Sequence, residues 1–281
     1  LLSSYWEDLD MKFTTLVCGL VGAAGILAAH TAAAQQHVTD EMLRTAQEDP
    51  NNWLMATGNY TGNRFSKLGQ INTGNVRNLV PKWIFSLGVL DAQNTTPVVQ
   101  DGVMYATASH GRTYALDASS GTELWRYAHQ LPEGVAGKMC CDIGNRGVAL
   151  YGDKVFVATP DAHVVALNKE TGEVIWDEMI GNWENAYTMT VAPLVVKGKV
   201  IVGMSGAEYP TRLYIDALDA DTGKQVWRRY TIPGPGEPGH DSWGNADAAK
   251  YGGASAWITG SYDPDLDVLY WGVGNPNPDW D

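Results

Sequence analysis

The chain has 281 residues, of which 44% are hydrophobic and 18% charged, so it can bury a sizeable core as one large or two ordinary domains. Its formal net charge of −13 argues against nucleic-acid binding, which needs a basic face, and is compatible with a soluble protein that docks a basic partner. Trp (11) and Tyr (13) far outnumber Phe (4), and 31 Gly supply many turns, which favours β structure with repeated aromatic anchors.

The N-terminus has the pattern of an export signal. Met11 and Lys12 precede an apolar run over residues 13–29 and an Ala-rich end at Ala32–Ala34. We therefore expect a signal peptide over 11–34, cleaved after about Ala34, with 1–10 as upstream translated sequence. A buried helix or a membrane anchor is the alternative, but the run is short and rich in Gly and Ala. The mature chain, 35–281, would then carry no transmembrane segment.

The mature chain begins with a helical pattern within residues 37–50, where we expect a short helix, followed by irregular or β structure over 52–65. A repeat then sets in: the related segments are DASSGTELW (117–125), NKETGEVIW (168–176) and DADTGKQVW (219–227). Trp125, Trp176 and Trp227 follow one another at intervals of 51 residues, and Trp83 is a looser predecessor.

Each repeat has the same order of elements: a turn, a strand, a second turn, a second strand, a Thr/Ser-Gly turn and a short strand ending at Trp. The strands are expected over 103–109, 154–160 and 199–205, with partners over 113–118, 164–169 and 214–220. A period near 50 residues with several strands per unit predicts an all-β propeller in which each Trp docks one blade on the next. Three clear units, a leading unit and a trailing strand make about half of a closed propeller, so we expect the N-terminal half of a longer domain, because open sheet edges are avoided.

The repeat gives way to a Pro/Gly-rich segment over residues 231–251, which we expect to be a long loop. It contains Gly-x-Gly-x-x-Gly at 234–239, but no βαβ unit surrounds this string, so a dinucleotide site is not predicted. A strand is expected again over 267–272.

Few enzyme signatures are present. The sequence has no P-loop and no G-x-S-x-G, and its six histidines show no metal-ligand spacing: His30, His37, His110, His129, His163 and His240. Cys140 and Cys141 are adjacent, and a disulfide between them would close a small strained ring, clip almost no chain and present a rigid apolar knob. Two free, buried thiols are the alternative.

Four further side chains have the chemistry of a binding site. Arg146, in a Gly/Asn turn, suits an anionic or carbonyl oxygen, unless it is a surface turn residue. Trp257 lies outside the 51-residue register and could be a stacking platform or a core residue. Glu208 and Asn275 each follow a strand and a glycine-containing turn, and offer the hard oxygen ligands that Ca²⁺ requires, unless they are turn residues without a metal.

Taken together, these residues resemble the quinoprotein alcohol dehydrogenases, which use pyrroloquinoline quinone (PQQ). The resemblance runs from about Asn52 to Asp281, and its markers are NWLMATGNYTGNRFS, CCDIGNRG, TVAP at 190–193, SGAE at 205–208, PGPGEPG and WGVGNP at 271–276. The Trp repeats alone are unspecific. The adjacent cysteines, the following arginine, SGAE and GNP in this order are highly specific.

The resemblance implies an eight-bladed propeller with PQQ on its axis. Cys140–Cys141 would form a disulfide over one face of the quinone, Trp257 would stack on the other, and Arg146 would contact the quinone oxygens. Thr190, Ser205, Gly206 and Ala207 would bind the edge of the cofactor. Glu208 and Asn275 would be protein ligands of Ca²⁺ or a lanthanide, with PQQ atoms supplying others.

It also implies a periplasmic oxidation of a primary alcohol to an aldehyde. The metal would polarise the quinone carbonyl, a carboxylate base would take the alcohol proton, hydride would move to the quinone and Arg146 would stabilise the developing charge. Electrons would pass to a cytochrome c or a haem domain. A homodimer or a small-subunit partner is possible in such a family.

Three departures from the family pattern matter. The family's Asp base is expected beyond the end of this chain, so the isolated chain is expected to be inactive and Arg146 is the catalytic residue that can be named. Asn94 replaces a Glu that the family often has, and Pro210–Leu213 replaces Gly-Val-Arg-Gly beside the metal. Two alternative functions stay open: a non-catalytic propeller scaffold, and a PQQ dehydrogenase for a sugar or polyol.

Overall fold

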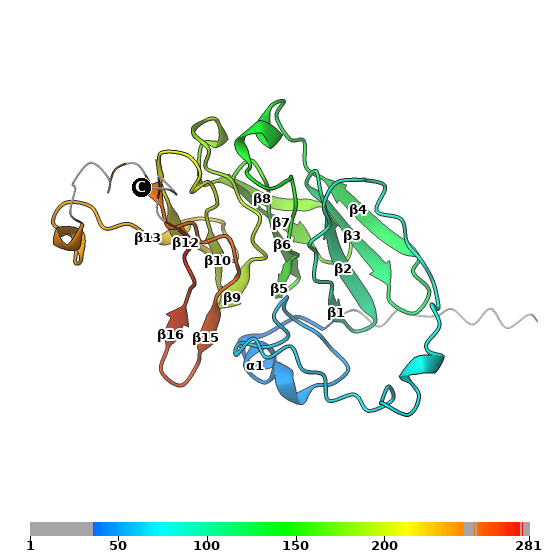
Figure 1. Cartoon of the computed structure of the whole chain (residues 1–281). Coiled ribbons are helices and arrows are strands. Elements are labelled where there is room, and N and C mark those ends of the chain that lie inside the picture. The colour runs from blue at the N-terminus through cyan, green and yellow to red at the C-terminus, as the bar shows by residue number, and fades with distance from the viewer. Residues whose placement is uncertain (1–35, 244–249, 251, 276, 278–281) are drawn as a thin grey trace, which may run out of the picture. The chain divides into compact units, whose positions relative to one another are not determined.

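The computed structural model describes residues 36–243, 250, 252–275 and 277, and its main feature is a set of four-stranded antiparallel sheets built alike (Figure 1). The described residues form one compact unit. The predicted upstream segment 1–10 and signal peptide 11–34 lie outside the described residues.

Three sheets repeat one meander, in which consecutive strands are neighbours. The first comprises β1 Val98–Gln100, β2 Val103–Ala108, β3 Arg112–Asp117 and β4 Glu123–Ala128. The second comprises β5 Ala149–Tyr151, β6 Lys154–Ala158, β7 His163–Asn168 and β8 Val174–Met179. The third comprises β9 Leu194–Val196, β10 Lys199–Gly203, β12 Tyr214–Asp219 and β13 Gln225–Tyr230. The predicted repeating all-β architecture is confirmed.

The repeat extends to irregularities in strand pairing. The register of the last two strands of each sheet shifts at Ala115/Leu116, Ala166/Leu167 and Ala217/Leu218, which are again 51 residues apart. A bulge at this point bends the outer strand and sharpens the local twist, so the three sheets share their curvature as well as their topology.

The repeat tryptophans join the sheets. The Trp125 indole lies on Gly172, where an added Cβ would be 2.6 Å from Cε3, and Trp125 Nε1 donates a 3.0 Å hydrogen bond to the carbonyl oxygen of Lys169. Trp83 packs on Gly121 in the same way, and Trp176 packs on Gly223. Their indole nitrogens donate to Ala118 and Ala220. The prediction that the repeat tryptophans dock one unit on the next is confirmed for Trp125 and Trp176.

Some details differ from the sequence prediction. The short first strands β1, β5 and β9 were not predicted, because three residues are too few to show a period. The strands expected to end at Trp continue for three residues beyond it, through the ends of β4, β8 and β13. The alternation of buried and exposed residues that is typical of a strand with one solvent face is absent from β6, where residues 155–158 are at most 1% exposed. This strand is covered on both faces from residue 155 onward, so the side chains of residues 155–158 are all buried, and only Lys154 is partly exposed.

Smaller elements complete the described chain. β11 Thr211–Arg212 pairs in parallel with β14 Gly252–Gly253, and β15 Ser261–Asp263 pairs with β16 Val268–Tyr270 near the strand predicted over 267–272. The predicted N-terminal helix is α1 Asp40–Arg44. Thr39 is its N-cap, because the Thr39 hydroxyl oxygen accepts a hydrogen bond from the backbone amide of Met42. Short 3₁₀ helices occur at Ala46–Glu48, Val76–Asn78, Val135–Lys138, Trp183–Asn185 and His240–Ser242.

The segment predicted as a long loop over 231–251 contains the last of these 3₁₀ helices, His240–Ser242. Its described part is fixed by Glu237, whose carboxylate accepts hydrogen bonds from Arg212 Nη2 at 2.6 Å and from the Gly234 amide at 2.8 Å. In the described ranges, no helix is both long and apolar enough to cross a bilayer.

Candidate cofactor site

A cavity of about 250 Å³ lies where loops from several sheets meet. These loops follow β4, precede β9, follow β10, follow β14 and follow β16. The residues that line the cavity are Asn94, Met139, Cys140, Cys141, Asp142, Gly144, Arg146, Thr188, Thr190, Ser205, Gly206, Glu208, Ser255, Trp257 and Asn275. The structure thus brings every predicted site residue except Ala207 to one cavity wall.

A larger, more open hollow of about 670 Å³ lies elsewhere, beside β15 and β16. Its lining includes Arg64 but no carboxylate, thiol or imidazole, and none of the predicted site residues. The smaller cavity is the better candidate because its polar groups converge on a partly enclosed space.

Cys140 and Cys141 are joined by a disulfide, with Cα atoms 3.8 Å apart. Both residues are exposed, so the alternative of two free, buried thiols is wrong. The next residue, Asp142, has a left-handed φ of 84° and accepts hydrogen bonds from the amides of Ala92 at 2.8 Å and Ile143 at 2.7 Å. These backbone hydrogen bonds lower the pKa of the Asp142 carboxyl. The loop that contains the disulfide is therefore held in place by the hydrogen bonds of the adjacent residue Asp142.

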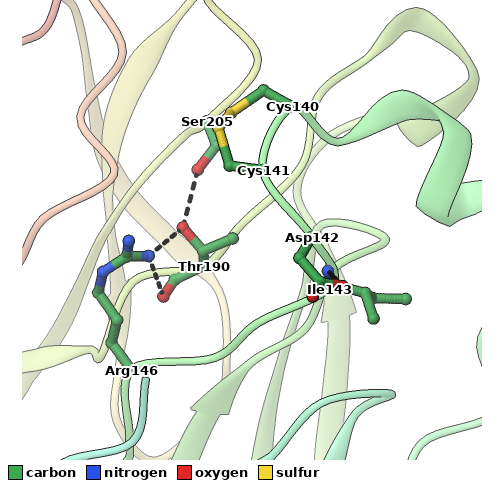
Figure 2. The surroundings of a disulfide bond; sticks show 7 residues. All are labelled: Cys140, Cys141, Asp142, Ile143, Arg146, Thr190 and Ser205. Atoms are coloured by element: carbon green, nitrogen blue, oxygen red, sulfur yellow. Dashed lines mark hydrogen bonds between the residues drawn. A yellow bond between two sulfur atoms is a disulfide. The ribbon is translucent and has the colours of Figure 1, made fainter. Parts of the chain in front are cut away.

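Arg146 is held from both backbone and side chain (Figure 2). Its amide donates to the carbonyl oxygen of Thr190 at 3.1 Å, and its carbonyl oxygen accepts from the Thr96 amide at 3.0 Å. Its Nη1 donates to the Thr190 hydroxyl at 2.5 Å and to the Thr190 carbonyl oxygen at 3.1 Å. Burial lowers the pKa of the guanidinium, but an arginine stays charged in proteins. The cavity therefore contains a fixed, partly desolvated positive charge, and the alternative of a free surface arginine is wrong.

The segment Ser205–Glu208 turns sharply at Gly206, whose φ is 114°. An added Cβ there would lie 2.1 Å from the carbonyl oxygen of Ala186, so only glycine fits. The Ser205 hydroxyl is 3.3 Å from that of Thr190, which extends the hydrogen-bonded row from Arg146. Ala207 is fully buried behind the turn rather than on the cavity wall, and its carbonyl oxygen accepts from Asn277 Nδ2 at 2.8 Å.

Glu208 and Asn275 line the same cavity from the loops after β10 and β16. Both are exposed, and the carbonyl oxygen of Asn275 accepts a 2.6 Å hydrogen bond from the Ala254 amide. A carboxylate and an amide oxygen are hard ligands that suit Ca²⁺ or a lanthanide, although two protein ligands leave most of a coordination shell for other donors.

Trp257 is 37% exposed and lies on the cavity wall, so it is not a core residue. The guanidinium carbon of Arg146 is 4.6 Å from its ring centroid, within cation–π distance. An accessible indole face is thus held beside the cation.

The donor set fits a flat, oxygen-rich cofactor with an accompanying cation. Two apolar groups of fixed shape, the disulfide and the indole, offer surfaces for a ring system, while Arg146 and the row of hydroxyl groups offer donors for its oxygens. One hydroxyl supports this fit directly. Thr188 Oγ1 lines the cavity, its residue is 1% exposed, and the described residues supply it with no hydrogen-bond partner. A buried polar atom of this kind normally has a partner, which a ligand in the cavity could provide.

Sequence reasoning missed several wall residues, namely Met139, Asp142, Gly144, Thr188 and Ser255. Thr188 had a usable signal, because it lies two residues before Thr190 in an extended segment and alternate residues face the same side. Asn94 was noted as a departure from the family pattern, and it does line the cavity.

The profile of one protein family, described as "PQQ: Glucose/ethanol/alcohol dehydrogenase, beta-propeller domain", matches residues 53–280. The chain is 42% identical over 262 residues to quinohemoprotein alcohol dehydrogenase ADH IIB of Pseudomonas putida, covering 90% of this chain and 38% of that protein.

Solved structures agree. The chain resembles that of quinohemoprotein alcohol dehydrogenase ADHIIG from Pseudomonas putida HK5 with a TM-score of 0.82 and 39% identity, over 87% of this chain and 37% of the other. It resembles a europium-containing methanol dehydrogenase with a TM-score of 0.78 and 34% identity, over 84% and 44% of the two chains. The chain thus spans about two fifths of the length of these relatives. With four fifths of its residues matched by the profile, the chain belongs to the PQQ family of glucose, ethanol and alcohol dehydrogenase β-propeller domains.

Proposed function

We propose that this protein is a periplasmic, PQQ-dependent alcohol dehydrogenase that oxidises a primary alcohol to an aldehyde. The observation that carries the proposal is the convergence, on one cavity, of the Cys140–Cys141 disulfide, Trp257, Arg146, Glu208 and Asn275. The names of the relatives, which are alcohol dehydrogenases, support the reaction class. We further propose that the complete protein closes an eight-bladed propeller around this cavity, of which the three described sheets are part.

The cavity would hold PQQ between two apolar surfaces. The disulfide would cover one face of the ring system and Trp257 the other, while Thr190, Ser205 and Gly206 would lie along its edge, with Ala207 buried behind them. Thr188 Oγ1 adds a buried hydroxyl that still needs a partner. Pre-formed apolar walls keep water from the reacting face, which strengthens every electrostatic interaction inside.

Glu208 and Asn275 would hold Ca²⁺ or a lanthanide beside the cofactor. The europium in the name of one related structure supports an ion of this hard, oxygen-binding class. When bound, PQQ would supply the acceptor for the hydride of the alcohol carbon, and the ion would supply Lewis acidity at the cofactor.

Arg146 is the catalytic residue that the geometry supports best. Two hydrogen bonds to Thr190 fix its guanidinium before any substrate binds, so it needs no reorganisation to stabilise negative charge that develops on an oxygen in the cavity. No residue is assigned as the base that accepts the alcohol proton. We propose a cytochrome c as the electron acceptor, and the net charge of −13 is compatible with a basic partner surface.

The test is reconstitution of the complete gene product with PQQ and either Ca²⁺ or a lanthanide, followed by alcohol-dependent reduction of an artificial electron acceptor. Activity should require both additions and should fall by at least about 100-fold in Glu208→Gln, since the charged one of the two protein ligands becomes a neutral amide. The matched control is Glu170→Gln, an exposed carboxylate in the turn after β7.

Two outcomes would redirect the proposal. If the protein binds no quinone with any metal, the scaffold alternative takes its place. If the protein binds PQQ and the metal ion but oxidises only sugars or polyols, the PQQ-dependent dehydrogenase reaction is retained and the proposed primary-alcohol substrate is wrong.

A further inference from the structure

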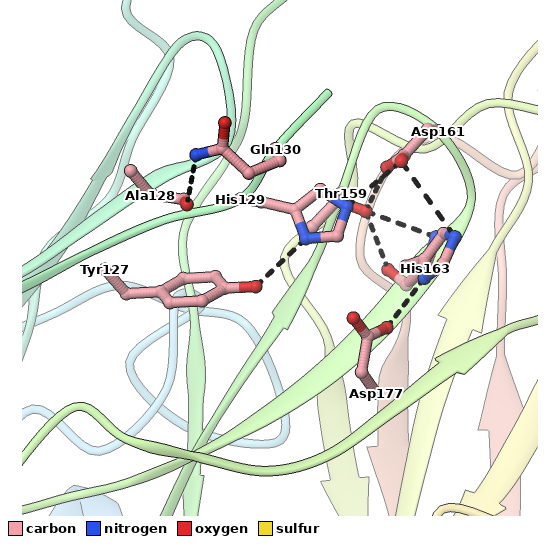
Figure 3. Close-up of polar contacts among 8 residues, drawn as sticks. All are labelled: Tyr127, Ala128, His129, Gln130, Thr159, Asp161, His163 and Asp177. Atoms are coloured by element: carbon pink, nitrogen blue, oxygen red, sulfur yellow. Dashed lines mark hydrogen bonds and ion pairs between the residues drawn. The ribbon is translucent and has the colours of Figure 1, made fainter. Parts of the chain in front are cut away.

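A second cluster of ligating side chains lies outside the cofactor cavity, and none of its members lines that cavity. It consists of His129, Asp161 and His163, whose nearest ligand atoms all lie within 4.8 Å of one another. Figure 3 shows the Asp161 carboxylate between the two imidazole rings. Asp161 Oδ2 is 3.0 Å from His129 Nε2 and 3.9 Å from His163 Nε2.

Each ligand atom is oriented by an outer partner (Figure 3). The Tyr127 hydroxyl is 2.9 Å from His129 Nδ1, and Asp177 Oδ1 is 2.6 Å from His163 Nδ1. The Thr159 hydroxyl donates to Asp161 Oδ1 at 2.6 Å, which leaves Oδ2 facing both rings. Outer hydrogen bonds of this kind, on the nitrogen away from the metal, are typical of histidines that bind metal ions.

The cluster is enclosed on most sides. Asp161 is 2% exposed, and the side chains of His129 and His163 are 8% and 26% exposed. Burial alone would raise the pKa of Asp161, but hydrogen bonds from His129 and Thr159 outweigh it and lower that pKa. The partial exposure of His163 gives an ion access to the cluster.

Two sheets contribute to the cluster. His129 directly follows β4 of the first sheet, whereas Asp161 precedes and His163 begins β7 of the second. The turn between β6 and β7 holds Ala162 at a left-handed φ of 66°, and its neighbours Asp161 and His163 both contribute ligand atoms to the cluster. The 34-residue separation of the histidines resembles no local metal motif, so the sequence prediction of no metal site among them could not anticipate this contact.

We propose that His129 Nε2, His163 Nε2 and Asp161 Oδ2 bind a Zn²⁺ ion that clasps the first and second sheets together. Two imidazole nitrogens and a carboxylate are a ligand set that Zn²⁺ uses, with water in the fourth position. Tetrahedral ligands at normal Zn²⁺ distances are about 3.3 Å apart, between the two separations measured from Asp161. The hard oxygen pair Glu208 and Asn275 suits a different class of ion, so this site is independent of the proposed alcohol oxidation.

The alternative is a cluster in which Asp161 shares protons with the two imidazoles and binds no metal. Zn²⁺ titration by calorimetry and Co²⁺ substitution, followed by the visible bands of bound Co²⁺, distinguish the two. Both are done on the complete protein after chelation and dialysis, without PQQ or alcohol and with Ca²⁺ in excess. We expect one equivalent of Zn²⁺ to bind in the wild type and four-coordinate Co²⁺ bands to appear.

Variants locate the binding site. His163→Gln and Asp161→Asn each remove one ligand and should weaken Zn²⁺ by at least about 100-fold, while Tyr127→Phe removes an outer hydrogen bond and should weaken it about 10-fold. The matched control is His110→Gln, which breaks an exposed His110–Asp91 pair at 2.6 Å and should leave affinity unchanged.

The proposal is overturned if the wild type takes up no stoichiometric Zn²⁺, or if His163→Gln binds it as tightly as His110→Gln does. Because His163 is partly exposed, its variant should fold even if Asp161→Asn does not. Circular dichroism of each variant checks this.

Discussion

Replacement of Gly172 by alanine should loosen the contact between the first and second sheets. Gly172 has a left-handed φ of 74°, which costs a non-glycine residue about 1 kcal/mol. The added Cβ would lie 2.6 Å from Trp125 Cε3, so the indole must move by roughly 1 Å to reach normal contact. That movement weakens the hydrogen bond to Lys169, worth about 1 kcal/mol, and disturbs packing at a further cost of about 1–2 kcal/mol. The expected loss in the free energy of unfolding is therefore about 3–4 kcal/mol.

The matched control is Gly102→Ala, since Gly102 has a φ of 79° and no atom within 4 Å of an added Cβ. It should cost about 1 kcal/mol, and the loss of chain entropy in the unfolded state is common to both variants. Urea unfolding followed by far-UV circular dichroism gives the difference from the midpoint and slope.

A double-mutant cycle isolates the contact itself. In a Trp125→Leu background the larger ring is gone, so Gly172→Ala should cost no more than Gly102→Ala does. The reasoning fails if the two glycine variants differ by less than about 0.5 kcal/mol in the wild-type background, or if the Gly172 and Trp125 effects simply add.

Three further outcomes are expected. Gly206→Ala places a Cβ 2.1 Å from a backbone carbonyl oxygen, so it should displace the turn by about 1 Å and reduce PQQ affinity by at least about 10-fold, measured by titration of the apoprotein. Two serine hydroxyl groups and two amides lower the pKa of Asp117 to about 2, so stability from this turn is complete above pH 3.8 and is lost as pH falls toward 2; a carboxyl NMR titration should show this, and Ser119→Ala should move the inflection upward. Arg228→Met leaves the fully buried Asp216 without its bidentate partner, so urea unfolding should show a loss of about 3 kcal/mol at pH 7 and a smaller loss at pH 4, where the carboxyl can protonate.

The repeating part of the fold was predictable because its signals are local. A Thr/Ser-Gly turn and a Trp recur at a fixed interval, and both the turn and the docking contact follow from these residue types. The short strand β5 was not predictable, since three apolar residues do not define a period. The two-sided burial of β6 depends on neighbours that are distant in sequence, which a pattern of single residues does not specify.

The residues of the candidate site also divide into those that the sequence predicts and those that it does not. Cys140–Cys141 and Glu208 were identified because rare sequence patterns mark them, and Thr188 was overlooked because a lone threonine is common in turns. The His129–His163 pair could not be found from the sequence, since it exists only where two sheets dock.

The tryptophan–glycine contacts between the sheets have a consequence for how the protein unfolds. Trp125 and Trp176 each pack on a glycine in a turn of the following sheet, so these two contacts couple nearest neighbours along the chain of sheets. The free energy of unfolding of such an array is approximately the sum of one term for each sheet and one term for each contact between neighbouring sheets. A substitution that weakens one contact therefore affects mainly the two sheets that share it. Local unfolding should then spread from one sheet to its neighbour across these contacts. The second sheet has a tryptophan–glycine contact on each side, so its amide hydrogens should exchange last.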